Sequence, residues 1–166
     1  KVAVLDEGYT YWINHNYPVS SGESINPVGN FDGTPHENML ATTRDVTEMV
    51  SKSTGCLIDA RSPQRYIGSF EPIDPIAGHI PGAINRFHQL NLLDDFRLLP
   101  ADILKSQFTE LISGHSIEEV VVYCGSGVTS CHHLLALEIA GLSGARLYAG
   151  SWSEWIRSPV RPISFG

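Results

Sequence analysis

The sequence predicts an α/β fold in which a parallel β-sheet carries helices on both faces. Two short segments, 56–58 and 119–123, are predicted as buried strands, and the second is a run of β-branched and aromatic residues typical of a strand buried on both sides. Segments in which apolar residues recur every three or four positions alternate with these strands, as expected for amphipathic helices. This alternation is typical of parallel sheets, because each helix returns the chain to the edge where the next strand begins.

Length and charge limit the classes of function. The 166 residues suffice for one ordinary domain and an appendage. The formal net charge of -7 argues against nucleic acid and against an anionic membrane surface as partners, and no apolar segment approaches membrane-spanning length. The three cysteines, Cys56, Cys124 and Cys131, form no disulfide framework and fit a reducing compartment, so we expect a cytoplasmic protein.

The beginning of the chain is similar in pattern to a segment near its other end. Residues 2–5 have a strand-like composition and precede a glycine and Trp12, while a short apolar strand around Leu147 precedes a glycine and Trp155. One internal repeat of domain length is the simplest explanation. We therefore expect residues 1–18 to be the tail of a preceding repeat.

The segment after this tail has the composition of a linker. Residues 19–38 are rich in Pro, Gly and Ser and have no periodic apolar pattern. Such a segment is expected to cross the surface between repeats. The main domain is then predicted to span residues 39–166.

The elements of this domain follow from their periodicity. A helix capped by Thr42 or Thr43 precedes the strand 56–58, and a second helix lies within 96–112. A third helix follows the strand 119–123, and a last strand lies around Leu147. The predicted apolar faces of the three helices are Val46, Met49 and Val50; Leu104, Phe108, Leu111 and Ile112; and Val128, Cys131, Leu135, Ile139 and Leu142.

A cysteine lies where the strand 119–123 ends and the third helix follows. Open α/β sheets bind ligands at the carboxyl ends of their strands, and the free amides and dipole of a helix amino end favour anions. Gly125 and Gly127 let the backbone curl so that successive amides point at one centre. These features are expected to lower the pKa of the Cys124 thiol below the ordinary ~8.5. The alternative is a buried structural cysteine followed by two turn glycines.

The loop Cys124-Gly125-Ser126-Gly127-Val128-Thr129 resembles the active-site loop of the rhodanese superfamily. It is similar to the 3-mercaptopyruvate sulfurtransferase branch, because thiosulfate sulfurtransferases usually carry basic residues where this chain has Gly125 and Ser126. Further blocks resemble family motifs in the same order and, with the loop, cover most of residues 40–160: 57–68, 78–85 and 148–155. The resemblance implies the rhodanese fold and makes residues 1–18 the tail of a preceding rhodanese domain.

The resemblance also implies a reaction. As a thiolate, Cys124 would take sulfur from a small anionic donor, 3-mercaptopyruvate, as a persulfide, and pass it to cyanide or to a thiol acceptor such as thioredoxin or a small thiol. Ser126 matches a catalytic loop serine that works with a histidine and an aspartate of the preceding repeat. Substrate binding is expected from the loop residues Gly125, Gly127, Val128 and Thr129. Thr129 is further expected to hydrogen-bond near the sulfur, and neither a metal nor an organic cofactor is expected.

Charged residues follow the strand that leads to Asp59. Asp59 and Arg61 lie at its carboxyl end, on the edge of the sheet expected to carry Cys124. Arg65 lies four residues past Arg61, so a helical turn would place both guanidinium groups on one side. The resemblance implies that Arg65 binds the anionic group of the substrate through paired hydrogen bonds. It also implies that Arg61 is a supporting residue paired with an acid such as Glu71. The alternative for Arg65 is a solvated surface charge.

One departure from the family pattern leaves the sulfur donor open. Family members that use mercaptopyruvate typically carry a second arginine in a Glu-Pro-Arg segment, where this chain has Glu71-Pro72-Ile73. Either the affinity is low, or another residue substitutes, or the donor differs. Thiosulfate sulfurtransferase is therefore an alternative activity, and a rhodanese module that only binds a partner is an alternative of a different class.

Other reactive residues form weaker patterns. Cys131, His132 and His133 are adjacent in a predicted helix, so they point in different directions and cannot close a metal site; Cys131 is expected in the core. A dual-specificity phosphatase is disfavoured, because its loop needs an arginine where this chain has Ser130. His79 is expected to hydrogen-bond within its family block. The remaining histidines have no constellation: His15, His36, His88 and His115.

Overall fold

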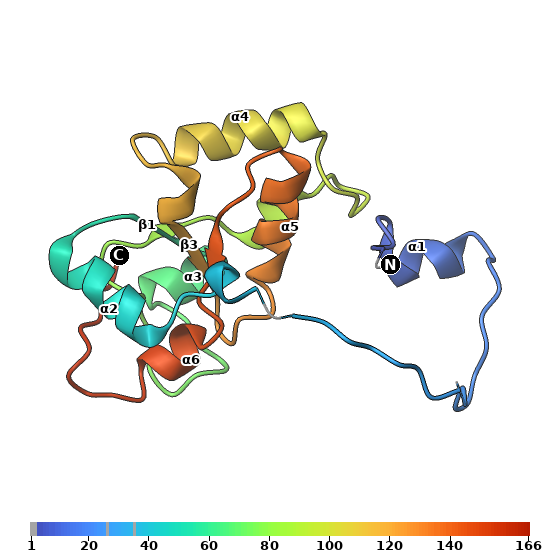
Figure 1. Ribbon diagram of the computed structural model, residues 1–166, viewed down its shortest axis with the longest axis horizontal. Coiled ribbons are helices and arrows are strands. Elements are labelled where there is room, and N and C mark those ends of the chain that lie inside the picture. Colours follow the sequence, from blue (N-terminus) through green and yellow to red (C-terminus); the bar gives the residue numbers. More distant parts are fainter. Residues whose placement is uncertain (1–2, 26, 35) are drawn as a thin grey trace.

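The computed structural model describes residues 3–25, 27–34 and 36–166 (Figure 1). Within these residues, four parallel strands form one sheet in the order β2-β1-β3-β4, with β1 at Cys56–Asp59, β2 at Ile84–Asn85, β3 at Val120–Tyr123 and β4 at Arg146–Leu147. The α-helices are α1 (Gly8–Asn14), α2 (Thr43–Lys52), α3 (Pro63–Ile67), α4 (Ala101–Leu111), α5 (Cys131–Ile139) and α6 (Ser151–Trp155). Short 3-10 helices are η1 (Glu37–Met39), η2 (His88–Asn91) and η3 (Ile117–Glu119).

Alternate side chains of the two central strands build two hydrophobic cores. Leu57 and Val121 point to one face of the sheet and pack with buried side chains of α2 and α6. Ile58 and Val122 point to the other face and pack with buried side chains of α4 and α5. In Figure 1, α4 lies above the central strands with α5 to their right, and α2 and α6 lie below them. The predicted α/β class, with a parallel sheet and helices on both faces, is confirmed.

The amino end of α2 is fixed by a reciprocal cap. The Thr42 hydroxyl accepts a hydrogen bond from the Asp45 amide at 3.2 Å, and the Asp45 carboxylate accepts one from the Thr42 amide at 2.8 Å. The Thr42 amide, together with the Thr42 hydroxyl that donates at 2.7 Å, lowers the pKa of the Asp45 carboxyl. Of the two threonines that the sequence offered, Thr42 is therefore the cap, and Val46 and Met49 are buried as predicted.

The helix α4 agrees with the sequence prediction. It begins at Ala101, directly after Pro100, whose ring fixes its own backbone angle at the entry of the helix. On its inner face Leu104 and Phe108 are buried against the sheet. Because this helix has one apolar face and one polar face, its periodicity suffices to orient it.

The helix α5 turns a different face to the core from the one predicted. It begins at Cys131, so Val128 lies in the preceding loop with 74% of its surface exposed, and the Cys131 side chain is exposed as well. The prediction of a core position is wrong for both residues. The buried residues are instead His133, Ala136, Leu137 and Ala140.

The register of α5 follows from a polar residue rather than from its apolar pattern. Apolar residues occur on both sides of this helix, so their spacing fits more than one face. The two ring nitrogens of His133 each lie 2.8 Å from a partner, one from the Asn91 amide nitrogen and the other from the Arg86 carbonyl oxygen. A buried imidazole needs such partners. The rotation of α5 about its own axis that brings His133 to these partners also determines which face of the helix is buried.

The first part of the chain lies away from the sheet in Figure 1. The helix α1 is present there, and the Trp12 indole donates a hydrogen bond to the Pro18 carbonyl oxygen at 2.8 Å. Residues 3–5 form no strand, which contradicts the prediction for them, and Val2 of the same predicted strand lies outside the described residues.

The predicted linker has little regular structure. Residues 19–25 and 27–34 contain no helix or strand and are exposed, and they run as a long segment between α1 and η1 (Figure 1). The division into a tail (1–18), a linker (19–38) and a domain (39–166) stays a prediction. None of the helices in the described ranges is long and apolar enough to cross a membrane.

Candidate active site

Cys124 lies in the loop between β3 and α5, at the carboxyl edge of the sheet. Its side chain is 2% exposed and forms part of the wall of a cavity of about 150 Å³. At roughly 30 Å³ for each water molecule, this space holds about five waters, which is the size of a small organic donor. Other polar residues in the wall are Arg61, Ser62, Arg65, His88, Gly125 and Thr129.

Hydrogen-bond donors surround the sulfur of Cys124. The Ser130 hydroxyl donates to Sγ at 3.6 Å. The backbone amides of Ser130, Ser126 and Gly127 also donate to the sulfur. Burial alone raises the pKa of the thiol, but these donors favour the thiolate and together hold the pKa of Cys124 below its ordinary value. The predicted lowering of the Cys124 pKa therefore has a geometric basis.

The start of α6 holds this loop in shape. The Trp152 amide donates to the Cys124 carbonyl oxygen at 3.1 Å, and the Ser153 amide donates to the next carbonyl oxygen along the loop at 2.9 Å. The Cys124 amide donates to the buried Ser151 hydroxyl at 3.1 Å. Because the loop carbonyls are turned toward α6, the following amides are left to face the sulfur.

Gly127 fits the loop because it has no side chain. Its φ of +81° is a conformation that glycine adopts readily, and a Cβ atom built on it would lie 2.4 Å from the Ala149 carbonyl oxygen. The sequence analysis identified this glycine but missed Ser130 and Ser151. Ser130 has a sequence signal, since it closes the loop six positions after Cys124. Ser151 reaches the loop from a distant part of the chain and has none.

Asp59 and Arg61 form a buried ion pair beside the cavity. Nη2 of Arg61 lies 2.6 Å from Oδ2 of Asp59 and donates to the Gly78 carbonyl oxygen at 2.7 Å, while Nη1 lies 3.3 Å from Glu71. Burial opposes the charge of Arg61, but the contacts with Asp59 outweigh it and raise the pKa of the guanidinium. The pairing of Arg61 with Glu71 agrees with the prediction, although Asp59 is its closer partner.

Arg65 also lines the cavity and keeps 15% of its side chain exposed. Its Nε donates to Glu71 at 2.9 Å, and its Nη2 donates to Asp74 at 2.9 Å. Glu71 thus contacts Arg61 and Arg65 together, so both guanidinium groups lie on one side, as predicted. Since two carboxylates partly neutralise Arg65, its attraction for an anion is weaker than that of an unpaired arginine.

The acidic segment after α3 replaces the arginine expected there. Burial alone raises the pKa of Glu71, but Arg65 and the amides of Asp74 and Ile73 hold it below its ordinary value. Ile73 stands at the position of the expected second arginine and is 74% exposed. Asp74 also accepts a hydrogen bond from the Ser153 hydroxyl at 2.6 Å. The segment therefore lacks the positive charge of the family pattern, and the carboxylates of Glu71 and Asp74 face Arg65 without a second arginine.

The loop that follows Cys124 brings some predicted residues to the cavity and leaves others outside. Gly125 and Thr129 line it together with Cys124. Ser126 and Val128 are exposed and do not belong to its wall. Within the described residues no hydrogen bond joins the Thr129 side chain to the sulfur, and the neighbouring Ser130 hydroxyl occupies that place.

A histidine that the sequence analysis set aside also lies in the cavity wall. His88 is the first residue of η2, and its Nδ1 lies 3.3 Å from the Ala60 carbonyl oxygen. Its ring meets that of His132 edge to face, with centroids 5.9 Å apart. Burial, and then the neighbouring His88, lower the pKa of His132. His88 was interpreted as a histidine without other reactive residues near it, and that interpretation is wrong. The fold brings His88 and His132 together, although their spacing in the sequence does not show it.

The remaining candidate metal ligands are used in other contacts. The Cys131 thiol donates to the Gly127 carbonyl oxygen at 3.3 Å. His133 is buried, which lowers its pKa to about 3, so it is neutral at physiological pH. In the part of the chain that the structure describes, no group of three or more His, Cys, Asp or Glu side chains could hold a metal ion.

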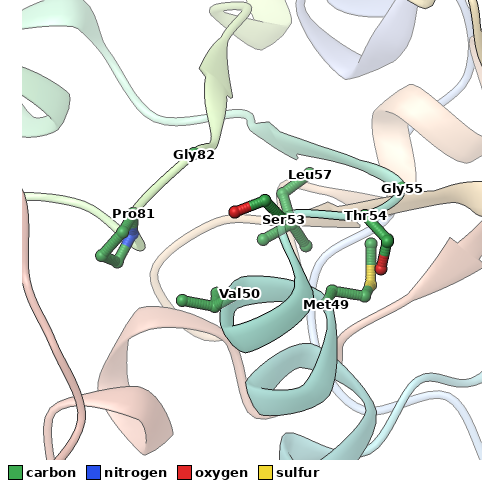
Figure 2. Close-up of a pocket in the computed structure, with 8 residues that line it drawn as sticks. All are labelled: Met49, Val50, Ser53, Thr54, Gly55, Leu57, Pro81 and Gly82. Carbon is green, nitrogen blue, oxygen red and sulfur yellow. The ribbon is translucent and has the colours of Figure 1, made fainter.

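A second cavity of about 320 Å³ lies at the opposite edge of the sheet, where β1 begins (Figure 2). Met49 and Val50 come from the end of α2, and Pro81 lies across from Gly55 in the view of Figure 2. The hydroxyls of Ser53 and Thr54 are its polar side-chain groups. Although this cavity is larger, its wall has no titratable or strongly nucleophilic side chain. The smaller cavity at Cys124 is therefore the candidate active site.

Comparison with known proteins agrees with the fold and with the loop. The model of the rhodanese-like domain family matches residues 42–158. The chain belongs to the rhodanese-like domain family. The match includes the Cys124 loop, the Asp59 and Arg61 pair, and α6, so all elements that build the candidate site lie within the rhodanese domain.

Relatives of this rhodanese domain carry the names of sulfurtransferases. A Pseudomonas aeruginosa protein named "Probable 3-mercaptopyruvate sulfurtransferase" is 44% identical over 99% of this chain and 58% of its own length. A thiosulfate sulfurtransferase of Rattus norvegicus is 32% identical over 94% of this chain and 53% of its own length. The chain thus spans a little over half the length of the curated relatives it matches.

A solved structure shows the same fold. The anaerobic ergothioneine biosynthesis enzyme from Chlorobium limicola, in complex with trimethyl histidine, superposes with a TM-score of 0.82 at 21% identity. The match covers 98% of this chain and 41% of that one. At this identity the likeness supports the rhodanese-like fold and carries no conclusion about the reaction.

Proposed function

We propose that this protein is a sulfurtransferase that takes a sulfur atom from 3-mercaptopyruvate and passes it to a thiol or to cyanide through a persulfide on Cys124. The observation that carries the proposal is the Cys124 sulfur, held by hydrogen-bond donors in a small cavity beside Arg65. The donors that favour the thiolate also suit a persulfide, whose outer sulfur carries the negative charge. The names of the relatives support the same reaction class.

The reaction has two halves. The Cys124 thiolate attacks the sulfur of the donor, the bond between that sulfur and carbon breaks, and pyruvate leaves once its carbon has gained a proton. The acceptor, as a thiolate or as cyanide, then attacks the outer sulfur of the persulfide. That step returns Cys124 to the thiolate form, so no outside oxidant or reductant is needed.

The charges around the cavity favour a donor with one negative charge. Arg65 is the cation proposed to bind the donor carboxylate, and Glu71 and Asp74 already occupy two of its nitrogen groups. A dianion such as thiosulfate meets the same arginine and a stronger repulsion from the two carboxylates. Thiosulfate is the second candidate donor, and the name of the rat relative supports it.

The location of the protein and a preceding domain belong to the same proposal. We propose a cytoplasmic protein in which residues 1–18 end a preceding rhodanese domain. Trp12 and Trp155 support this repeat, because each indole donates to a proline carbonyl oxygen, of Pro18 at 2.8 Å and of Pro162 at 2.9 Å. Ser126 is exposed, so a histidine and an aspartate of that domain could reach it.

The test is the mass of the protein after reaction with each donor. The natural full-length protein is incubated with 3-mercaptopyruvate or with thiosulfate and weighed intact. A gain of one sulfur atom that is faster with 3-mercaptopyruvate and absent in Cys124→Ser supports the proposal. The matched control is Cys131→Ser, since Cys131 is an exposed cysteine seven positions away that is assigned no role in the transfer.

The other outcomes separate the alternatives. A faster gain with thiosulfate would make the protein a thiosulfate sulfurtransferase. No gain with either donor, in a protein whose circular dichroism shows it to be folded, would favour a rhodanese module that only binds a partner.

A further inference from the structure

The cavity wall contains one more group that can move a proton. Apart from the nucleophile, its titratable side chains are Arg61, Arg65 and His88. Arginine stays charged in proteins, whereas imidazole both accepts and donates a proton near neutral pH. Departure of pyruvate requires a proton on the carbon that loses sulfur, so the location of His88 is relevant to the chemistry.

The contacts of His88 leave one of its nitrogens available. Nδ1 lies 3.3 Å from the Ala60 carbonyl oxygen, which can only accept a hydrogen bond, so Nδ1 carries a hydrogen. The backbone amide of His88 donates to the same oxygen at 3.2 Å. Within the described residues Nε2 of His88 makes no hydrogen bond. It is therefore the nitrogen that can exchange a proton with a bound molecule.

The neighbouring residues orient the His88 ring without forming an ion pair with it. His132 meets it edge to face, and Nδ1 of His132 lies 3.2 Å from the Asn91 side-chain amide. Phe87 contacts it from another side, with ring centroids 4.6 Å apart at an interplanar angle of 80°. His88 is thus oriented by two aromatic rings and a backbone carbonyl, while none of these partners is a carboxylate.

We propose that His88 is a catalytic residue that protonates the leaving carbon in the donor half-reaction, which rests on the proposed sulfurtransferase function. The size of the cavity supports this role: a space of about 150 Å³ that Cys124, Arg65 and His88 line together brings all three against the same small donor. Arg65 would hold the carboxylate, Cys124 would attack the sulfur, and His88 would meet the carbon between them.

The atoms and electrons of this step balance within the site. The Cys124 thiolate forms a bond to the donor sulfur, and the pair of electrons of the breaking sulfur–carbon bond goes to the carbon. The imidazolium of His88 gives that carbon its proton, so pyruvate leaves. The imidazole then takes the proton that the transferred sulfur carried in the donor. The two sulfur atoms are oxidised and the carbon is reduced by the same two electrons.

The test compares two reactions of Cys124 in the natural full-length protein. Persulfide formation from 3-mercaptopyruvate needs a proton on carbon, whereas alkylation of the thiolate by iodoacetamide does not. In His88→Gln, persulfide formation is expected to slow by at least about 100-fold, the usual contribution of general acid catalysis, while alkylation stays within twofold of the native rate. His115→Gln, the same change at an exposed histidine, is expected to leave both rates unchanged.

Three results would contradict the proposed role of His88, and each points to a different cause. Native persulfide formation in His88→Gln would show that the proton comes from elsewhere. An equal fall in both rates would show that His88 only supports the loop. If the native protein is alkylated but gains no sulfur from 3-mercaptopyruvate, the proposed function itself fails, and the role of His88 fails with it.

Discussion

At the scale of single residues, Ser130 favours the thiolate form of Cys124. Its single hydroxyl hydrogen is shared between the Cys124 sulfur at 3.6 Å and the Gly127 carbonyl oxygen at 3.0 Å, so Ser130 links the sulfur to the loop backbone. A hydrogen bond to a charged group contributes about 1.5–3 kcal/mol. The pKa of Cys124 therefore depends on an uncharged residue, Ser130, which no pattern of charges in the sequence indicates.

The variant Ser130→Ala is expected to raise the pKa of Cys124. The native pKa is lowered, so the thiolate persists above it and is lost as the pH falls through it; in the variant this loss occurs at higher pH. At pH values below the midpoint of the profile, the rate of alkylation by iodoacetamide should fall by about 10-fold or more, as expected from a loss of about 1.5 kcal/mol. Ser113→Ala, at an exposed serine after α4, is the control. An unchanged pH profile would refute the role of the hydroxyl.

A second residue-scale prediction concerns donor choice. Asp74→Asn keeps the shape of the side chain that contacts Arg65 and Ser153 but removes one negative charge from the site. The KM for thiosulfate should fall by about threefold to tenfold, because a dianion gains more than a monoanion from the loss of a repelling charge. The KM for 3-mercaptopyruvate should fall less. The control is Asp94→Asn, at an exposed position. Equal changes for both donors would contradict this account of the charges.

At the scale of elements, the loop is shaped by its contact with the segment before α6. Gly127 and Gly141 both have positive φ, of +81° and +71°, yet a Cβ at Gly127 would strike Ala149 and one at Gly141 would meet open space. Gly141→Ala should therefore destabilise the protein by only about 1–2 kcal/mol through its backbone. Gly127→Ala should destabilise it more and also slow persulfide formation. Urea unfolding measures the first effect, and equal free energies for the two variants would argue against the close contact.

The helices show what periodicity predicts and what it does not. The helix α4 has one apolar face, and Leu104 and Phe108 were predicted on it correctly. The helix α5 is apolar on more than one side, and its inward face is selected by His133, whose partners Asn91 and Arg86 come from a different segment. Contacts of this kind depend on the assembled fold, which is why the prediction for Cys131 was wrong.

At the scale of the whole molecule, the predicted linker defines a test of the domain boundaries. Glu23 lies in an exposed segment without regular structure, whereas Glu138 lies in α5. A glutamate-specific protease at low concentration should cut at Glu23 first and leave Glu138 intact, because cleavage requires an extended chain. The remaining fragment should keep its circular dichroism spectrum. Early loss of that spectrum, or a first cut at Glu138, would contradict a separate domain at 39–166.

The site as a whole could be predicted only in part. Motif blocks led to Cys124, Asp59, Arg61 and Arg65, because each follows a strand whose carboxyl end faces the same edge of the sheet. His88 and its partner His132 could not be found this way. Their rings meet from segments more than forty residues apart in the chain, and the adjacent residues Cys131, His132 and His133 give no indication that His88 is the partner.

The hydrogen bond between the Cys124 amide and the Ser151 hydroxyl has a consequence for the synthesis of the protein. The two residues are 27 positions apart, and the carbonyl oxygens of the loop are held by the residues directly after Ser151. On the ribosome, Cys124 leaves the exit tunnel well before its partners do. Until α6 is present, the loop backbone lacks these contacts, so we expect the amides to turn toward the sulfur, and the pKa of Cys124 to fall, only after α6 has docked.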